Sequence, residues 1–295
     1  MDNKKNINSN RYESWEKKKF LIACDIDGTL VNKEGNLSKK TITDLKYITS
    51  LGHIICLITG RPTQGSIKLY EKLGLKTIMC NQNGSYISNP SNKNFRPIVI
   101  TFSKEILLRL FANKNLMKYV NNSLIEGVNK GWLLRKPDNN MSIKQMMEMF
   151  HLVNRDISII KNDLKKINTD ICSILLHINN LENINSIIYE VKRIAPTLTI
   201  RTWSLPSEGV IIEINGTFAS KENALEFLSS YYGIPLEQCI SFGDGDNDVG
   251  MLSRAVWGFA LKNATPAARL AARFMTKYDN NNDGVVRELR KFLKI

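Results

Sequence analysis

The chain has 295 residues, of which 43% are hydrophobic, and its formal net charge at pH 7 is +13. This length allows two domains with a core each. The lack of an apolar run of about 20 residues, or of an apolar core near the N-terminus, argues against a membrane span and a secretory signal, so a cytoplasmic protein is expected. No aromatic and basic motif of a nucleic-acid-binding module accompanies the charge, so neither a nucleic acid nor a membrane is predicted as a partner.

A polar segment, residues 1–18, opens the chain and is expected to be disordered because it has too few apolar residues to bury. Short apolar runs then alternate with amphipathic stretches, which predicts a parallel sheet with crossover helices. In chain order, the predicted elements are a strand at 19–24, a helix at 39–51, a strand at 53–58, a helix at 65–73 and a strand at 77–81.

An insertion of mixed character, residues 86–208, interrupts this pattern. It carries strand-like runs at 97–102, 173–178 and 197–202 and helical ones at 104–111, 143–153 and 180–194. More than half of the excess positive charge lies between residues 86 and 210. This charge either attracts an anionic substrate or forms a solvated basic surface.

From residue 209 the alternation of strands and helices resumes. Helices are predicted at 221–232, 249–254 and 264–271, and strands at 239–242, 256–261 and near 274. One core domain, residues 19–85 and 209–295, is therefore predicted to be split in sequence by an inserted domain, residues 86–208.

Two carboxylates, Asp25 and Asp27, lie where the first apolar strand meets a glycine turn. Both are expected to project from the carboxyl end of the strand toward one crevice. This arrangement suits a nucleophile and an acid/base that share one metal. By itself a D-x-D pair is modest evidence, because it also binds metal in glycosyltransferases and occurs in ordinary turns.

Further signals follow in order: Thr59-Gly60-Arg61 after the second apolar strand, Asn83-Gly84-Ser85, an isolated Lys221, and Gly243-Asp244-Gly245-Asp246-Asn247-Asp248 after the strand at 239–242. With these motifs the chain resembles the haloacid dehalogenase (HAD) superfamily, and within it the Cof-like phosphatases with a type IIB cap. The resemblance covers nearly the whole chain from about residue 19. It implies an α/β fold, with a Rossmann-like core around a parallel sheet and an inserted α/β cap built on an antiparallel sheet.

The resemblance also implies a role for each motif. Asp25 would attack phosphorus and form an aspartyl-phosphate, and Asp27 would serve as acid and then as base. The lysine motif departs from the family pattern, since Glu222 stands where a glycine is usual. The residues expected to bind the phosphate oxygens are Thr59, the Gly60 amide, Lys221 and Asn247.

Two carboxylates facing a phosphate dianion repel it unless a cation lies between them. Mg²⁺ suits a site with oxygen ligands alone, and the absence of nearby His and Cys ligands argues for this ion. Asp244 is ranked above Asp248 as a ligand, and both above Asp246, which is interpreted as an exposed turn residue. The predicted Mg²⁺ ligands are Asp25, the Asp27 main-chain carbonyl, Asp244 and Asp248.

Two other parts of the sequence carry weaker signals. The stretch 279–284 begins like a calcium loop, but Arg290 occupies the twelfth position where a bidentate Glu is needed, so a polar surface turn is predicted. Weak candidates for substrate contact in the insertion are Trp132, Arg135, Lys136, Arg201 and Trp203.

The sequence therefore predicts a Mg²⁺-dependent phosphatase for small phosphorylated metabolites, by resemblance most often sugar phosphates, acting as a monomer or homodimer. The alternative enzyme is a phosphomannomutase-like sugar phosphomutase, which has a similar cap and first motif. The compact spacing from Gly243 to Asp248 favours hydrolysis. A non-enzymatic binding module is a third alternative, although every expected catalytic position is occupied.

Overall fold

The computed structural model describes residues 18–137, 141–152, 156–205 and 209–295, so the predicted polar tail lies outside the described residues except for Lys18. The fold is α/β, as predicted. The chain divides into two compact units: unit 1 combines Met1–Ile55 with Ser229–Ile295, and unit 2 is Cys56–Leu228. Within the described ranges, no helix has both the length and the apolar character needed to cross a membrane.

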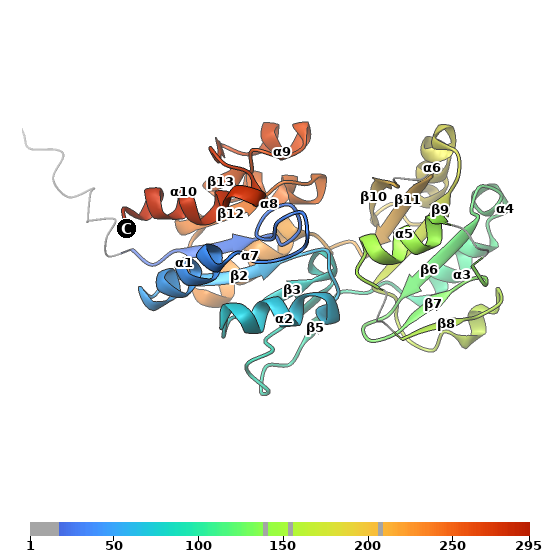
Figure 1. Cartoon of the computed structure of the whole chain (residues 1–295). Coiled ribbons are helices and arrows are strands. Elements are labelled where there is room, and N and C mark those ends of the chain that lie inside the picture. The colour runs from blue at the N-terminus through green and yellow to red at the C-terminus, as the bar shows by residue number, and fades with distance from the viewer. Residues whose placement is uncertain (1–17, 138–140, 153–155, 206–208) are drawn as a thin grey trace, which may run out of the picture. The chain divides into compact units, whose positions relative to one another are not determined.

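A parallel sheet forms the centre of unit 1, with strands in the order β14-β13-β12-β1. Every residue of β1 and β12 is buried, which is typical of parallel strands covered on both faces. β1, the first strand of the described chain, thus shares one sheet with β12, β13 and β14 from its last part (Figure 1). The strands are β1 (Leu21–Cys24), β12 (Cys239–Gly243), β13 (Trp257–Ala260) and β14 (Phe274–Met275).

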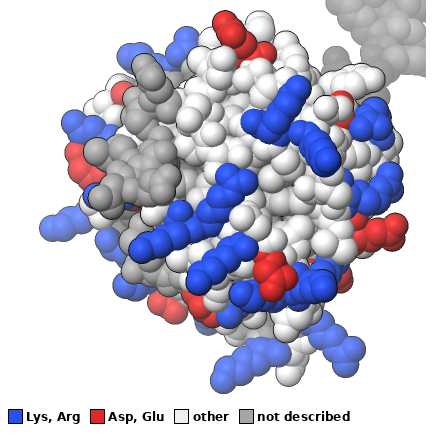
Figure 2. All heavy atoms as spheres, turned by 90° about the vertical axis from the view of Figure 1, so that its right-hand side faces the viewer, with Lys and Arg blue, Asp and Glu red and all other residues white. Residues whose placement is uncertain are grey.

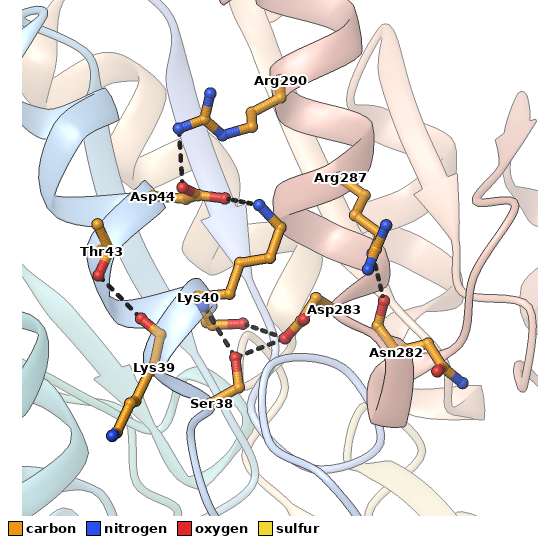
Figure 3. A network of polar contacts seen from close by, with 10 residues as sticks. Ser38, Lys39, Lys40, Thr43, Asp44, Asn282, Asp283, Arg287 and Arg290 are labelled. Atoms are coloured by element: carbon orange, nitrogen blue, oxygen red, sulfur yellow. Dashed lines mark hydrogen bonds and ion pairs between the residues drawn. The ribbon is translucent and has the colours of Figure 1, made fainter.

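The helices that lie wholly in unit 1 are α1 (Lys39–Ser50), α8 (Val249–Arg254), α9 (Pro266–Ala271) and α10 (Gly284–Leu293). A polar network joins α1 to the start and face of α10 (Figure 3). Asp283 accepts hydrogen bonds from the hydroxyls of Ser38 and Thr41. Asp44 accepts from Lys40 Nζ at 2.7 Å and from Arg290 Nη2 at 2.9 Å.

Asp44 is expected to contribute pH-dependent stability to unit 1. Burial alone would raise the pKa of its carboxyl, but the hydrogen bonds and positive charges of Arg290 and Lys40 hold that pKa below its ordinary value of 3.8. The carboxylate form therefore favours the folded state above that value, and its contribution is lost as the pH falls through the lowered folded pKa. Both cations are partly exposed, so Asp44→Asn should lower the free energy of unfolding by only about 1 kcal/mol at pH 7.

Urea unfolding of both proteins between pH 7 and pH 3 measures this effect. The difference in unfolding free energy between wild type and Asp44→Asn should shrink as the pH drops below about 4. A difference that stays constant over this range would contradict the role given to the Asp44 carboxylate.

The first sheet of unit 2 follows the order β2-β3-β4-β5. β2 and β3 are parallel, whereas β4 and β5 turn back as antiparallel strands. Its strands are β2 (Ile54–Ile58, which begins just before the unit), β3 (Met79–Asn81), β4 (Tyr86–Ser88) and β5 (Ile98–Val99). α2 (Thr63–Leu73) connects β2 to β3, and α7 (Lys221–Tyr232), which follows the second sheet in the chain, continues into unit 1.

A second sheet in unit 2 follows the order β10-β11-β9-β6-β7-β8 and is antiparallel except between β7 and β8. Its strands are β6 (Asn122–Glu126), β7 (Gly131–Leu133), β8 (Ile157–Ile159), β9 (Ser173–Ile178), β10 (Thr199–Ser204) and β11 (Val210–Asn215). This sheet is called the cap sheet below. It lies within the range predicted as the inserted domain, apart from β11, which lies wholly beyond residue 208.

The two faces of the cap sheet have different coverings. Alternate residues of β9, such as Ile174 and Leu176, pack in a core with α3, α4 and α6. Leu175, on the opposite face, packs with Ile143 and Met146 of α5. The helices are α3 (Lys104–Ala112), α4 (Lys114–Met117), α5 (Met141–Met149) and α6 (Ile184–Ile194).

The basic surface predicted for the insertion is visible on the side of unit 2 that carries α4 (Figure 2). Lys and Arg side chains are spread over this face among a few acidic ones. Lys114 and Lys118 are both exposed. The charge on this face is therefore solvated and spread out.

The five cysteines are free and buried, and all but Cys172 lie in strands. Burial raises the pKa of the Cys239 thiol to about 11, so this side chain stays protonated at neutral pH. The five free cysteines are Cys24, Cys56, Cys80, Cys172 and Cys239.

Candidate active site

Three acidic side chains of unit 1 gather at the carboxyl ends of neighbouring strands. Asp25 follows β1, and its N–H donates to the carbonyl of Phe242 in β12 at 3.0 Å. Asp244 follows β12, and Asp248 lies in the next turn. One carboxylate oxygen from each of Asp25, Asp244 and Asp248 lies within 4.8 Å of the others. Asp25 is 5% exposed and Asp248 is fully buried.

The turn after β1 fixes the Asp244 carboxylate. Thr29 Oγ1 donates to Asp244 Oδ1 at 2.8 Å. Gly28 has a φ of +69°, and a Cβ built there would lie 2.1 Å from Asp244 Oδ2. Any larger residue at position 28 would therefore both strain the backbone and displace this carboxylate. Close approach to a predicted metal ligand explains the glycine at this position.

Asp248 has a structural contact in addition to its place in the cluster. Its Oδ2 accepts from the backbone N–H groups of Asp244 at 3.0 Å and Gly245 at 2.9 Å. These bonds close the loop between Asp244 and Asp248 tightly and orient the Asp248 carboxyl group. Asp248 therefore holds the loop that carries Asp244.

Asn263 belongs to this site but is not among the site residues predicted from the sequence. Its Nδ2 donates to Gly28 O at 2.8 Å and lies 3.5 Å from Asp244 Oδ2. Its Oδ1 accepts from the backbone N–H of Asn280, whose own amide group donates to Val31 O. The stretch 279–284, predicted as a polar surface turn, thus fixes the loop next to the carboxylates.

The remaining predicted residues of unit 1 lie in the two loops that carry the cluster. Asp27 is exposed, so its side chain is available to exchange protons with solvent or a substrate. Asp246 is also exposed and accepts from Thr265 Oγ1, in agreement with its prediction as a turn residue. Asn247 is half-buried in the turn that precedes α8.

The phosphate-binding candidates Thr59, Gly60 and Lys221 belong to unit 2. Thr59 is buried, and its hydroxyl oxygen accepts from Arg61 N–H at 3.1 Å. The Arg61 guanidinium donates to Gly65 O at 2.8 Å, so this side chain braces its own loop. Lys221 is the first residue of α7 and is fully buried, which is rare for a lysine and argues against an ordinary surface role.

The weak candidates of the insertion separate into different environments. Trp132 is 3% exposed in the core beneath the cap sheet, so it is a packing residue. Arg135 donates to Asn162 and to the carbonyl of Asn121, and Lys136 is exposed. Arg201 donates to Asn215, and Trp203 donates to Glu213.

The donor set of the carboxylate cluster fits magnesium. Oxygen atoms alone face one another, and a hard cation that retains water ligands would neutralise the repulsion between them. Within the ranges that the structure describes, this is the one group of three or more His, Cys, Asp or Glu side chains close enough to share an ion.

Comparison with known proteins agrees with this geometry. The model of the haloacid dehalogenase-like hydrolase family matches residues 22–289. The 5-amino-6-(5-phospho-D-ribitylamino)uracil phosphatase YitU of Bacillus subtilis is 28% identical over 283 residues, covering 95% of this chain and all of that protein.

Solved structures show the same fold. A haloacid dehalogenase-like hydrolase from Bacteroides thetaiotaomicron superposes with a TM-score of 0.76 at 23% identity, covering 93% of this chain and 100% of the other. The HAD subclass IIB sugar phosphatase BT4131 superposes with a TM-score of 0.75 at 22% identity, covering 94% of this chain and 100% of the other.

Proposed function

The chain belongs to the haloacid dehalogenase-like hydrolase family, as a Cof-like phosphatase, and on this premise we propose that it is a Mg²⁺-dependent hydrolase of small phosphorylated metabolites. The observation that carries the proposal is the cluster of Asp25, Asp244 and Asp248 at the ends of adjacent parallel strands. A cluster of three carboxylates, two of them buried, is costly unless a cation or a reaction requires it. It is the arrangement expected for phosphoryl transfer to an aspartate.

In the proposed reaction, an Asp25 oxygen attacks phosphorus and the ester P–O bond breaks. Asp27 gives its proton to the departing alkoxide. Asp27 then takes a proton from water, which attacks the aspartyl-phosphate, releases inorganic phosphate and restores Asp25. Bound Mg²⁺ would supply positive charge that lowers the repulsion between Asp25 and the phosphate.

The ligands proposed for Mg²⁺ are Asp25, the Asp27 main-chain carbonyl, Asp244 and Asp248. Thr29 and Asn263 then act through Asp244 and Gly28, since they fix the carboxylate and the turn. We assign the binding of phosphate oxygens to Thr59, the Gly60 amide, Lys221 and Asn247. The full burial of Lys221 supports this assignment, because a buried ammonium beside a phosphate interacts strongly with it.

Sugar phosphates and related compounds are the substrate class that we propose. The name of the Bacillus relative specifies a phosphorylated ribitylamino compound, and a structural neighbour is named a sugar phosphatase. We further propose that residues 19–85 and 209–295 form the catalytic core and 86–208 the cap, with β11 from the start of the second core segment completing the cap sheet. We also propose that the enzyme acts in the cytoplasm as a monomer or homodimer, without a nucleic-acid or membrane partner.

The alternative is a phosphomannomutase-like enzyme, which would return the phosphoryl group to a sugar hydroxyl instead of passing it to water. The two Asp248 hydrogen bonds keep the segment from Gly243 to Asp248 compact, which favours the hydrolase. Phosphorus NMR of a hexose 1-phosphate with the enzyme and Mg²⁺ distinguishes them. We expect free phosphate to accumulate without added bisphosphate; conversion to hexose 6-phosphate with little free phosphate would favour the mutase.

A panel of phosphorylated metabolites, assayed with and without Mg²⁺, would then rank substrates.

A further inference from the structure

The turn Gln82–Gly84, which follows β3, has an unusual backbone. Its three residues have φ values of +49°, +54° and +93°. The third residue is a glycine, which adopts positive φ values readily. The first two carry side chains, and for them this left-handed conformation costs free energy. All three are buried. Surrounding contacts must therefore stabilise this turn.

The backbone of this turn contacts both parts of unit 2 to which phosphate binding is assigned. The Asn83 N–H donates to Thr59 O at 3.0 Å, and the Gln82 N–H donates to Arg61 O at 3.1 Å. A Cβ on Gly84 would lie 2.6 Å from Ser220 O, in the residue before Lys221. Movement of the turn would therefore shift the Thr59 loop and the start of α7 together.

The side chains of the same turn reach the cap sheet. Asn83 Nδ2 donates to Glu213 Oε1 at 3.0 Å, and Gln82 Nε2 donates to Glu126 Oε1 at 3.3 Å. Both glutamates are 4% exposed, so these bonds are shielded from water. Hydrogen bonds to a buried carboxylate are stronger than those between neutral groups.

Each glutamate is also held from its own sheet. The indole N–H of Trp203 donates to Glu213 Oε2 at 2.9 Å, and the Ser173 hydroxyl donates to Glu126 Oε2 at 2.7 Å. Both oxygens of each carboxyl group therefore accept a hydrogen bond. Glu213 on β11 and Glu126 on β6 are therefore held in place, and each accepts a hydrogen bond from a side chain of the turn.

We propose that Glu213 on β11, together with Glu126 on β6, is a positioning residue for phosphate binding. The two glutamates hold the Gln82–Gly84 turn in its strained conformation, and this turn holds the Thr59 loop and the start of α7. This inference rests on the proposed function, because it takes Thr59 and Lys221 as phosphate-binding residues. It makes the affinity for the phosphoryl group depend on the cap sheet, through residues that do not touch the substrate.

A swap of donor and acceptor tests the proposal. Asn83→Asp places two carboxyl groups against each other. Glu213→Gln leaves one donor without an acceptor, because Trp203 can only donate and Asn83 Nδ2 also donates. In the double variant, the new amide at position 213 can donate to the new carboxylate at position 83 and accept from Trp203, so the pair is complementary again. An aspartate also tolerates the left-handed conformation at position 83.

The matched control makes the same swap at Asn113 and Glu190. There Asn113 Nδ2 donates to Glu190 Oε2 at 2.6 Å, in the same unit but between helices away from the turn. Asn113→Asp, Glu190→Gln and their combination should leave phosphate affinity as in wild type.

Three quantities are measured for each protein: the inhibition constant of inorganic phosphate, kcat/KM, and the Mg²⁺ dependence of thermal stability. We expect each single variant at positions 83 and 213 to bind phosphate about tenfold more weakly or worse, with kcat/KM falling in parallel. The double variant should bind phosphate several-fold more tightly than either single variant. The stabilisation by Mg²⁺, which reports the carboxylates of unit 1, should not change.

Single variants that are folded and bind phosphate as wild type does would overturn the inference. A double variant no better than the single ones, or one that fails to fold, would overturn it as well, because the swap preserves the hydrogen bonds and the number of charges. Wild-type protein that neither binds phosphate nor hydrolyses any phosphate ester would instead refute the proposed function.

Discussion

Asp25→Asn is expected to abolish turnover, with kcat falling about 10²-fold or more while the fold is retained, because a carboxamide does not attack phosphorus. The same change removes one of three mutually repelling carboxylates. The loss of this repulsion should favour the folded state of the variant when no metal is present. Steady-state kinetics with the best substrate of the panel, together with thermal unfolding in EDTA, measure both effects.

Asp246→Asn is the control for this experiment. Asp246 lies in the same region of the chain as the cluster but is exposed, and asparagine can still accept from Thr265 Oγ1. Its kcat should be that of wild type. An Asp25→Asn protein that keeps more than about a tenth of wild-type kcat would rule out Asp25 as the nucleophile.

Removal of metal is expected to have a comparably large effect. EDTA should eliminate activity, Mg²⁺ should restore it, and Ca²⁺ should inhibit, because its larger and looser coordination shell misplaces the nucleophile and the phosphate. Asp244→Ala should raise the Mg²⁺ concentration for half-maximal activity by about tenfold or more, since a hydrogen-bonded charge contact of this kind contributes about 1.4 kcal/mol or more.

Thermal unfolding gives a second measurement that does not depend on turnover. Mg²⁺ should raise the Tm of wild type and of Asp246→Asn, and it should raise that of Asp244→Ala much less. Full activity after dialysis against a chelator would show that the carboxylate cluster is not a magnesium site.

The sequence predicted those parts of the site that depend on local patterns. Asp25 and Asp244 each follow a short apolar run, and parallel strands bring such positions to one edge of a sheet. The paired strands confirm that expectation for these two residues. The roles of Thr59, Gly60 and Asn247 stay predictions, as does that of Lys221, whose burial nonetheless distinguishes it from a surface lysine.

Residues that act across long separations could not be found in this way. Asn263 and Gly28 are 235 positions apart, and Asn83 and Glu213 are 130 apart. Neither asparagine stands in a pattern that requires a partner, because Asn is common in turns for local reasons. Only the folded chain shows which distant group each amide meets.

The strands that were missed lie mostly in the cap sheet and have a related cause. β11 is buried along its whole length but contains Glu213 and Asn215, and β6 contains Asn122 and Glu126. Polar residues inside short buried strands remove both the continuous apolar run and the alternation by which strands are recognised. Glu213 and Glu126, which accept hydrogen bonds from the turn after β3, therefore also made β11 and β6 difficult to recognise from the sequence.

Unit 1 combines both ends of the chain, and this has a consequence for how the protein folds during synthesis. Thr29 and Asp244, which share a hydrogen bond, are 215 positions apart. At about 5–20 residues per second, a ribosome needs roughly ten to forty seconds to reach β12 after making β1. Meanwhile the apolar strand Leu21–Cys24 lacks β12, its partner in the parallel sheet, and is prone to aggregate. Unit 2 is a continuous segment that can form first. The carboxylate cluster appears only when Ser229–Ile295 closes unit 1, so chaperones that bind the nascent N-terminal strand should affect the yield of active protein more than the formation of the cap sheet.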